Sequence, residues 1–334
     1  MRARVGWARR SWVGEEMKHV TISCVIPTLG RGEILCQTIQ MLLDQSYPPH
    51  EIIVVDQTPA PDEQTHRKLE GWHKQEAIRW LHQTEANASK ARNAGALAAS
   101  GEVVLFLDDD IRIQPDFLAA YAETFARTGA PAVSGQILEA DDETVDTLPA
   151  RALDPEIGWL YFRKNYSKEC ETGFMMAGNV AIRRDLFFEV GGMDENYDKG
   201  AYREESDFAL RFARAGYRFH YNGRCTIHHL GASVVIGGGA RSWRHERAFW
   251  YFHHCVGDWY FNLRFVSLRM FFPLFSRSFQ AFVVNQARQR PWMIPCTFAF
   301  WLAAAPYALV RRLRGPRLCF GQVDSNSYLG MLAE

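Results

Sequence analysis

Three consecutive aspartates follow the most apolar strand-like segment of the chain. The segment is EVVLFL at 102–107, and the acids are Asp108, Asp109 and Asp110. Like charges this close repel and raise one another's pKa, so a divalent cation would stabilise them. Carboxylate oxygens suit Mg²⁺ or Mn²⁺, and such a cation would bridge to a substrate diphosphate. Because alternate residues of an extended chain share a face, Asp108 and Asp110 are the predicted metal ligands. The alternative is that the three aspartates are solvated acids at the start of a helix.

The segments around these aspartates alternate between strand and helix patterns. We predict strands at 20–26, 51–56, 78–81, 102–107 and 132–138, and helices at 33–45, 88–99 and 115–128. The clearest strands are β-branched and apolar on both faces, whereas the helices carry apolar stripes. This order predicts an α/β fold with a doubly wound, mostly parallel sheet, in which ligands bind at the carboxyl ends of strands. Asp56 and the aspartate triplet both lie at such ends.

The second half of the chain carries another acidic group. Glu204, Glu205 and Asp207 open a predicted helix, where acids also favour the positive end of the helix dipole. Around this group we predict a loop or lid at 141–170, a strand at 174–182, helices at 183–190 and 202–215, and one or two strands at 217–230. These elements predict one catalytic domain at 19–240, with halves at about 19–138 and 139–240, after an N-terminal extension at 1–18.

Six short motifs occur in the order found in one enzyme family. They are Ile26-Pro27-Thr28, Val54-Val55-Asp56, Ala91-Arg92-Asn93-Ala94-Gly95, Leu107-Asp108-Asp109-Asp110, Gly191-Gly192-Met193-Asp194-Glu195 and Glu204-Glu205-Ser206-Asp207. With Leu210-Arg211 through Gly216-Tyr217 after them, the chain resembles the family 2 glycosyltransferases, which have a GT-A fold. The resemblance covers roughly residues 20–240.

The resemblance implies a role for each matched position. The residues implied to bind the nucleotide sugar are Pro27, Thr28, Arg31, Asp56, Arg92, Asn93, Asp108 and Asp109. The aspartates match the family's DxD motif, which binds Mg²⁺ or Mn²⁺ through the donor's phosphates, and the cation acts as a Lewis acid on the leaving diphosphate. Glu205 matches an inverting enzyme's general base, and Glu204 and Asp207 are the alternatives.

Three further assignments follow from the resemblance or from side-chain chemistry. A family histidine near the metal matches His228 or His229, and we predict His228 as the ligand. The aromatic residues Trp159, Tyr161 and Phe162 would stack on acceptor sugars. Gly237-Gly238-Gly239, followed by Arg241 and Arg244, would form a flap over the diphosphate.

The C-terminal region differs in composition from the rest. Lys and Arg total 38 and balance 38 Asp and Glu, yet residues 241–334 hold 12 basic and 4 acidic side chains. Residues 292–310 carry no charge and span about 28 Å as a helix, near the thickness of a bilayer core. Residues 268–284 resemble a second, interfacial helix. We therefore expect 241–334 to be an aromatic, basic helical region on the cytoplasmic face of a membrane, as a peripheral, monotopic or single-span segment. Packing on the catalytic body, or a homodimer interface, is the alternative.

Composition and missing motifs exclude several function classes. A net charge of zero argues against a globally basic nucleic-acid binder, and seven cysteines without a CxxC pair argue against a zinc ribbon. A nucleotidyltransferase needs a Gly-rich triphosphate loop, which this sequence lacks. A haloacid-type phosphatase needs Thr or Val at the position that Arg112 occupies. We predict an inverting, metal-dependent glycosyltransferase that moves a sugar from a nucleoside-diphosphate sugar to a glycan or lipid-linked acceptor. The alternative from another class is a non-catalytic glycan-binding or scaffolding relative.

Overall fold

A computed structural model gives the structure of the chain. It describes residues 19–139, 142–154, 158–198, 202–230, 247–265, 268–285, 287–288 and 291–319. The predicted N-terminal extension at 1–18 and the predicted flap at 237–244 lie outside the described residues. All seven cysteines are free thiols.

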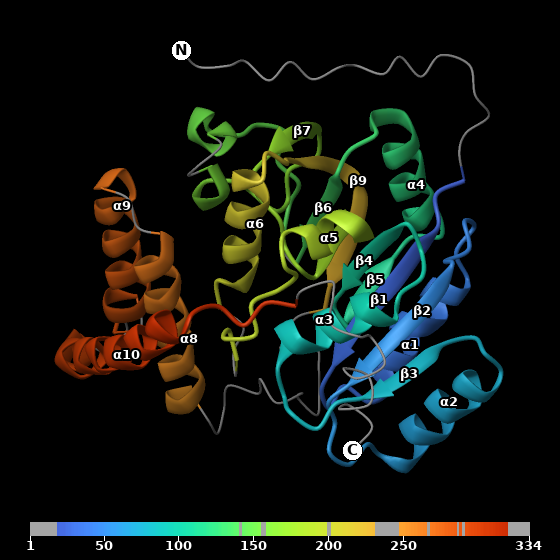
Figure 1. Ribbon diagram of the computed structural model, residues 1–334, viewed down its shortest axis with the longest axis horizontal. Coiled ribbons are helices and arrows are strands. Elements are labelled where there is room, and N and C mark those ends of the chain that lie inside the picture. The colour runs from blue at the N-terminus through green and yellow to red at the C-terminus, as the bar shows by residue number, and fades with distance from the viewer. Residues whose placement is uncertain are drawn as a thin grey trace.

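One mixed sheet forms the centre of the molecule (Figure 1). Its strands are β1 (Ile22–Thr28), β2 (Glu51–Asp56), β3 (Arg79–His82), β4 (Val103–Leu107), β5 (Ile111–Ile113), β6 (Ala132–Leu138), β7 (Glu169–Thr172), β8 (Asn179–Arg183) and β9 (Phe219–His229). The strand order is β3-β2-β1-β4-β8-β6-β9-β5, and β7 also pairs with β9. Strands β1 to β4 are mutually parallel, which brings the carboxyl ends of β1, β2 and β4 to one edge of the sheet.

Helices cover both faces of the sheet. They are α1 (Glu33–Leu43), α2 (Glu63–Lys74), α3 (Ala88–Ala98), α4 (Phe117–Thr128), α5 (Arg184–Glu189) and α6 (Glu204–Arg214). One buried cluster joins the sheet to α1, α2 and α4, and a second joins it to α3, α5 and α6. Helix α3 lies unusually close to the sheet, because a Cβ on Gly95 would overlap Val25. This close approach carries the polar residues of α3 to the carboxyl ends of the strands.

The C-terminal helices pack against this body. They are α8 (Arg247–Phe265), α9 (Leu268–Phe279), a π-helical segment (Gln280–Val284) and α10 (Ile294–Arg314). Figure 1 shows them together on one side of the molecule, far from β3 and α2. Trp301 of α10 belongs to a buried cluster that includes Trp159 and Leu210 of the body. After α10 the chain returns to the body, where the Cys319 amide donates a 2.8 Å hydrogen bond to the Gly191 carbonyl.

Helix α10 is buried along one narrow stripe only. Thr297, Trp301, Ala304 and Ala308 recur every three or four residues and face the neighbouring helices. Around them, the exposed apolar residues of α10 are Ile294, Phe298, Phe300, Leu302, Tyr307, Leu309, Val310 and Leu313. Among the described residues, only Pro291–Arg314 is long and apolar enough to cross a membrane, and 22% of its most apolar window is buried. Its outer surface is therefore unlike that of a helix in a soluble core.

Candidate functional site

The aspartate triplet lies where the carboxyl ends of β1, β2 and β4 meet. Thr28, at the end of β1, donates a 2.7 Å hydrogen bond to one carboxylate oxygen of Asp109. The other oxygen accepts from Nε of Arg31 at 2.9 Å. Burial raises the pKa of Asp109 to about 6, and the Arg31 charge opposes the rise. Asp109 was predicted to bind the nucleotide sugar, but Thr28 and Arg31 hold it inside the protein.

Asp108 and Asp110 approach a different group. Nε2 of His229 lies 3.1 Å from Oδ1 of Asp110 and 3.9 Å from Oδ2 of Asp108. The short strand β5 causes this arrangement, because Ile111 of β5 pairs with His229 of β9. The hydrogen bond with Asp110 raises the pKa of His229 to about 9. At neutral pH the imidazolium therefore donates to Asp110.

The predicted metal ligand His228 is on the wrong side of its strand. Its side chain is exposed, and its register partner on β5 is Arg112. Successive side chains of a strand face opposite sides, so His228 turns away while His229 faces the acids. The histidine beside the triplet is therefore His229, which corrects the choice between the two.

Asp108 and Asp110, beside His229, have the carboxylate chemistry that a divalent cation needs. The Asp108 side chain is 36% exposed, whereas that of Asp110 is 2% exposed and its Oδ2 lies 3.0 Å from Nη2 of Arg31. Within the described parts of the chain, no group of three or more His, Cys, Asp and Glu could hold a metal ion. Asp108 and Asp110 supply the hard oxygens, and the His229 imidazole beside them could ligate a cation only after it loses its proton. The remaining ligands would have to come from a bound phosphate and water.

One cavity, of about 290 Å³, opens next to Thr28 and Arg31. Its wall also includes Asp56 and Thr58 from the end of β2. The Asp56 carboxylate accepts hydrogen bonds from the Thr58 amide at 2.9 Å and from the Trp80 indole N–H at 3.2 Å. These two donors fix the orientation of the carboxylate. Pro27, predicted with Thr28 for nucleoside binding, is buried within β1 and does not line this cavity.

Helix α3 supplies a buried arginine that joins two acidic groups. Nη1 of Arg92 donates to Glu204 at 2.6 Å, and its Nη2 lies 3.7 Å from Oδ1 of Asp108. Ser89 donates a second hydrogen bond to Glu204 at 2.5 Å. Both Arg92 and Glu204 are almost fully buried. Glu204 therefore has the role of a fixed counter-ion, which argues against it as a proton acceptor.

Asn93 was predicted to bind the nucleotide sugar, and its contacts contradict that role. Its side-chain amide donates to the Met193 carbonyl at 2.9 Å, and its oxygen accepts from the Met193 amide at 2.8 Å. The side chain is fully buried. The amide also donates to Glu195 at 3.1 Å, so Asn93 fixes the 191–198 loop through two of its residues.

A second cavity, also of about 290 Å³, contains Glu205. Oε1 of Glu205 accepts a 2.8 Å hydrogen bond from the amide of Ala177. Burial, followed by the negative charge of Glu204, raises the pKa of Glu205 from 4.5 to about 7. The Asp108 charge adds to the rise, so these two carboxylates are close enough to interact. A carboxyl with a pKa near neutrality suits a general base.

Asp207 lies away from both cavities. Its carboxylate is fully buried and accepts from Nε of Arg211 at 2.6 Å and from the Tyr197 hydroxyl at 3.1 Å. Arg264 of α8 also contacts Asp207 and, in addition, Asp194. These contacts hold α6 against α8, so Asp207 positions the helix that carries Glu205 and is not itself an exposed acid.

The predicted aromatic platform is divided between two places. Trp159 lines the second cavity, together with Phe174. Phe162 instead packs in a separate cluster with Tyr221, at a ring distance of 4.8 Å. Tyr161 lies under the guanidinium of Arg277, at 5.4 Å from the ring centre. Only Trp159 of the three therefore lines the cavity that contains Glu205.

Several residues of the site have no signal in the local sequence. Trp80 fixes Asp56 from the neighbouring strand, and Ser89 fixes Glu204 from α3. Arg203 and Arg277 line the second cavity from elements that are far apart in the chain. Arg277 belongs to the 268–284 segment, which was predicted as an interfacial helix. The positive φ of Arg203, at 75°, appears only in the three-dimensional structure.

Comparison with known proteins agrees with this architecture. The family model described as glycosyl transferase family 2 matches residues 23–191, which include both acidic strand ends. The chain belongs to this family. Among curated proteins, it is 27% identical over 224 residues to the glucosyl-dolichyl phosphate glucuronosyltransferase of Haloferax volcanii, covering 64% of this chain and 69% of that protein. It is 25% identical over 209 residues to the amylovoran biosynthesis glycosyltransferase AmsB of Erwinia amylovora, covering 61% and 67%.

Two solved glycosyltransferase structures share the fold of this family 2 member. The mannosyltransferase PcManGT from Pyrobaculum calidifontis, in complex with GDP-Man and Mn²⁺, matches with a TM-score of 0.52 and 19% identity, covering 94% of this chain and 84% of that one. GalNAc-T7 with UDP, GalNAc and Mn²⁺ gives a TM-score of 0.52 and 16% identity, covering 80% and 58%. The predicted family and the predicted GT-A fold are confirmed.

Proposed function

We propose that this glycosyltransferase is inverting and metal-dependent, and that it uses a nucleoside-diphosphate sugar as donor. The observation that carries the proposal is that the aspartate triplet hydrogen-bonds to residues of one cavity and interacts electrostatically with a residue of the other. Thr28 and Arg31 line one cavity and bind Asp109, while Glu205 lines the other and interacts with Asp108. The first cavity would hold the nucleoside, with Asp56 accepting from a base N–H or a ribose hydroxyl. The second would hold the acceptor.

The diphosphate would lie between the two cavities. Asp108 and Asp110 would hold Mg²⁺ or Mn²⁺, which supplies Lewis-acid stabilisation of the leaving diphosphate. Arg31 is already beside these acids and offers a fixed positive charge at the same point. Negative charge grows on the diphosphate as the glycosidic bond breaks, so charges fixed in advance lower the barrier. The relatives bound to Mn²⁺ and nucleotides support this assignment by analogy of fold.

Glu205 would act as the general base. In the transfer, an acceptor hydroxyl gives its proton to a Glu205 oxygen while its own oxygen bonds to the anomeric carbon. The bond from that carbon to the diphosphate oxygen breaks, and the nucleoside diphosphate leaves with the electron pair. Attack opposite the leaving group inverts the anomeric centre. A pKa of about 7 lets Glu205 take up this proton near neutral pH.

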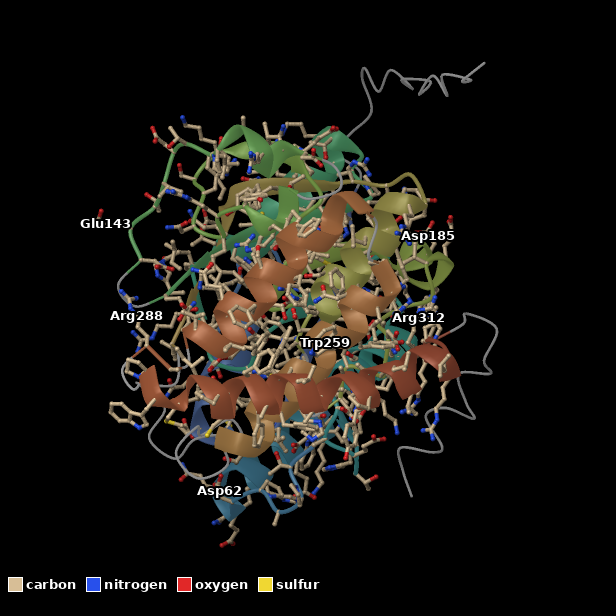
Figure 2. The ribbon with its side chains drawn as sticks, turned by 90° about the vertical axis from the view of Figure 1, so that its left-hand side faces the viewer. Asp62, Glu143, Asp185, Trp259, Arg288 and Arg312 are labelled. Carbon is tan, nitrogen blue, oxygen red and sulfur yellow. The ribbon has the colours of Figure 1, made fainter. Side chains whose placement is uncertain are left out.

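The C-terminal helices would attach the enzyme to a membrane surface. The exposed apolar face of α10 supports this, and so do Arg311, Arg312 and Arg314 in its last turn. Anionic lipids of a cytoplasmic leaflet attract such a basic cluster. Figure 2 shows α10 lying across the outer side of the helical region, with Arg312 near one end. The buried stripe of α10, and the return of the chain to the body after α10, favour a helix that lies in the membrane plane over one that spans the membrane. Homodimer formation stays a prediction.

Calorimetry with UDP, GDP and TDP, each with Mn²⁺ and with EDTA, tests the proposed function. We expect one nucleotide to bind with Mn²⁺ and to lose most of its affinity in EDTA, and Asp108→Ala to remove the Mn²⁺ effect. Asp116→Ala is the matched control, because Asp116 is exposed at the start of α4 and makes no side-chain cap. Absence of Mn²⁺-dependent binding of all three nucleotides would refute the proposal. Donor hydrolysis that Glu205→Gln abolishes would exclude the non-catalytic alternative.

A further inference from the structure

Glu205 lies between two residues that are both attached to helix α8. Arg203, two residues before it, forms a 2.8 Å ion pair with Asp258 of α8. Asp207, two residues after it, is contacted by Arg264 of the same helix. The carboxylates of Asp258 and Asp207 are fully buried, so water screens these two pairs little. The turn of α6 that carries Glu205 is therefore fixed on both sides by a helix of the C-terminal region.

Helix α8 approaches this turn very closely. A Cβ on Gly257 would lie 2.6 Å from the carbonyl oxygen of Tyr202, so a larger residue at this position would push the two segments apart. The close approach places Asp258, the next residue of α8, beside the start of α6. Asn262 donates a 3.1 Å hydrogen bond to one oxygen of Asp258, and the other oxygen accepts from Arg203. Helix α8 therefore fixes the orientation of this carboxylate.

The guanidinium of Arg203 also lies over three aromatic rings. Its central carbon is 5.2 Å from the ring centre of Trp159, 5.0 Å from that of Tyr202 and 5.8 Å from that of Phe261. The backbone of Arg203 has a φ of 75°, a conformation that is unfavourable for a residue other than glycine. The ion pair with Asp258 and the cation–π contacts together hold the side chain in this position.

Arg203 and Glu205 line the same cavity without forming an ion pair. Among the described residues, no arginine or lysine nitrogen lies within ion-pair distance of the Glu205 carboxylate, and its hydrogen-bond donor is the main-chain amide of Ala177. Arg277, the other arginine of the cavity, donates to the Leu160 carbonyl. An arginine that reached Glu205 would stabilise its charged form and make it a weaker base.

We infer that Asp258 is a positioning residue for the transfer reaction, because it holds the Arg203 guanidinium away from Glu205 and so keeps the Glu205 carboxylate available to the acceptor hydroxyl. The inference rests on the proposed function, in which Glu205 is the general base. Without the charge of Asp258, the Arg203 guanidinium would be a buried cation without its partner, which is strongly unfavourable. The acid among the residues that line the cavity is Glu205, so Arg203 would then pair with Glu205.

A pair of substitutions distinguishes this role from a purely structural one. The assay is the Mn²⁺-dependent hydrolysis of UDP-glucose, GDP-mannose or TDP-glucose by the full-length enzyme, with the nucleotide sugar that reacts fastest. We expect Asp258→Ala to lower kcat at least tenfold and to leave KM for the nucleotide sugar unchanged. Adding Arg203→Gln removes the cation that would pair with Glu205, so kcat should rise at least threefold above that of Asp258→Ala. A second substitution that only disturbs the structure further would not raise kcat.

Two other variants complete the test. Asp258→Asn keeps an acceptor oxygen but no charge, so it should lower kcat less than Asp258→Ala, and it replaces that variant if the alanine protein does not fold. Asp198→Asn is the matched control, because it breaks an ion pair between Arg311 of α10 and the body outside the cavity. This control should leave kcat unchanged. Wild-type kcat in both Asp258 variants, or a double variant no faster than its Asp258 parent, would overturn the inference.

The outcomes also separate this inference from the proposed function. A wild-type enzyme that hydrolyses none of the three nucleotide sugars would count against the proposed function alone. A crystal structure of Asp258→Ala, or of Asp258→Asn, then tests the placement of Arg203 directly. We expect an Arg203 nitrogen within ion-pair distance of a Glu205 oxygen. An Arg203 side chain that stays over the rings of Trp159 and Tyr202 would overturn the inference.

Discussion

Replacing Glu205 with glutamine should make the enzyme more stable at neutral pH and much less active. The amide keeps the shape of the side chain and an oxygen that can accept from the Ala177 amide. It removes a carboxyl whose charged form is disfavoured by burial and by the charge of Glu204. It also removes the proposed proton acceptor. Stability and activity should therefore change in opposite directions.

The size of the stability change follows from the pKa of Glu205. The folded-state pKa of about 7 is above the unfolded value of 4.5, so the folded protein binds this proton more tightly. Protonation favours folding below pH 4.5, and this contribution is lost as the pH rises through 7. At 1.36 kcal/mol per pKa unit the upper limit is about 3.4 kcal/mol. Because the side chain is not fully enclosed, we expect Glu205→Gln to gain about 2 kcal/mol at pH 8 and nothing at pH 4.

Urea unfolding from pH 4 to pH 8 in EDTA measures this difference. The contrasting variant is Glu204→Gln, which should destabilise the protein at neutral pH because it removes the charge that pairs with Arg92. In parallel, kcat of Glu205→Gln should fall by about 10²–10⁴. Wild-type kcat/KM should rise tenfold per pH unit up to about pH 7 and then level off. A stability difference that does not depend on pH, or full activity of Glu205→Gln, would show that our reasoning is wrong.

Three further changes test other parts of the structure. Arg92→Ala leaves a buried carboxylate without its counter-ion and should cost about 3–5 kcal/mol in urea unfolding; an unchanged midpoint would contradict the buried pair. Gly178→Ala places a Cβ against the Asp108 carboxylate, so Mn²⁺-dependent nucleotide binding, measured by calorimetry, should weaken about tenfold. Gly71 has open space around it, so Gly71→Ala should not change that binding. Leu302→Glu puts a charge on the exposed face of α10, so vesicle binding should fall about tenfold while the Tm stays the same. Retained vesicle binding would exclude this face as the surface that contacts the membrane.

The strand ends were predictable from the sequence because they depend on local pattern. Strands β2 and β6 have the predicted bounds: both are buried along nearly their whole length and follow clear breaks, although β6 includes the buried polar residues Ser134 and Gln136. The 174–182 segment is equally apolar, yet only Asn179–Arg183 forms a strand. Its first residues line the cavity around Glu205 instead. Apolar pattern alone does not distinguish a buried strand from a buried irregular wall.

The choice of side chains within the site depended on contacts between distant segments. His228 and His229 have the same chemistry, and only the pairing of β9 with the three-residue strand β5 decides which one faces the aspartates. Glu204 and Glu205 are likewise equivalent in sequence. They differ because Arg92, 112 residues away, pairs with one of them. Such long-range partners have no local signal, so the sequence predicted the set of acids and not their separate roles.

The distribution of arginines among these acids explains which ones can do chemistry. Arg31 holds Asp109 and Asp110, Arg92 holds Glu204, and Arg211 with Arg264 holds Asp207. An arginine keeps its charge at any physiological pH, so a carboxylate bound closely to it is held in place.

Glu205 and Asp108 are not held closely by an arginine. The hydrogen-bond donor to Glu205 is a main-chain amide, and the nearest arginine nitrogen to Asp108 is 3.7 Å away. A group that must gain and lose a proton cannot be fixed by a permanent cation, which fits Glu205 as the proposed base. Asp108 is the more exposed of the two proposed metal ligands, so it is the one open to solvent and to a bound phosphate.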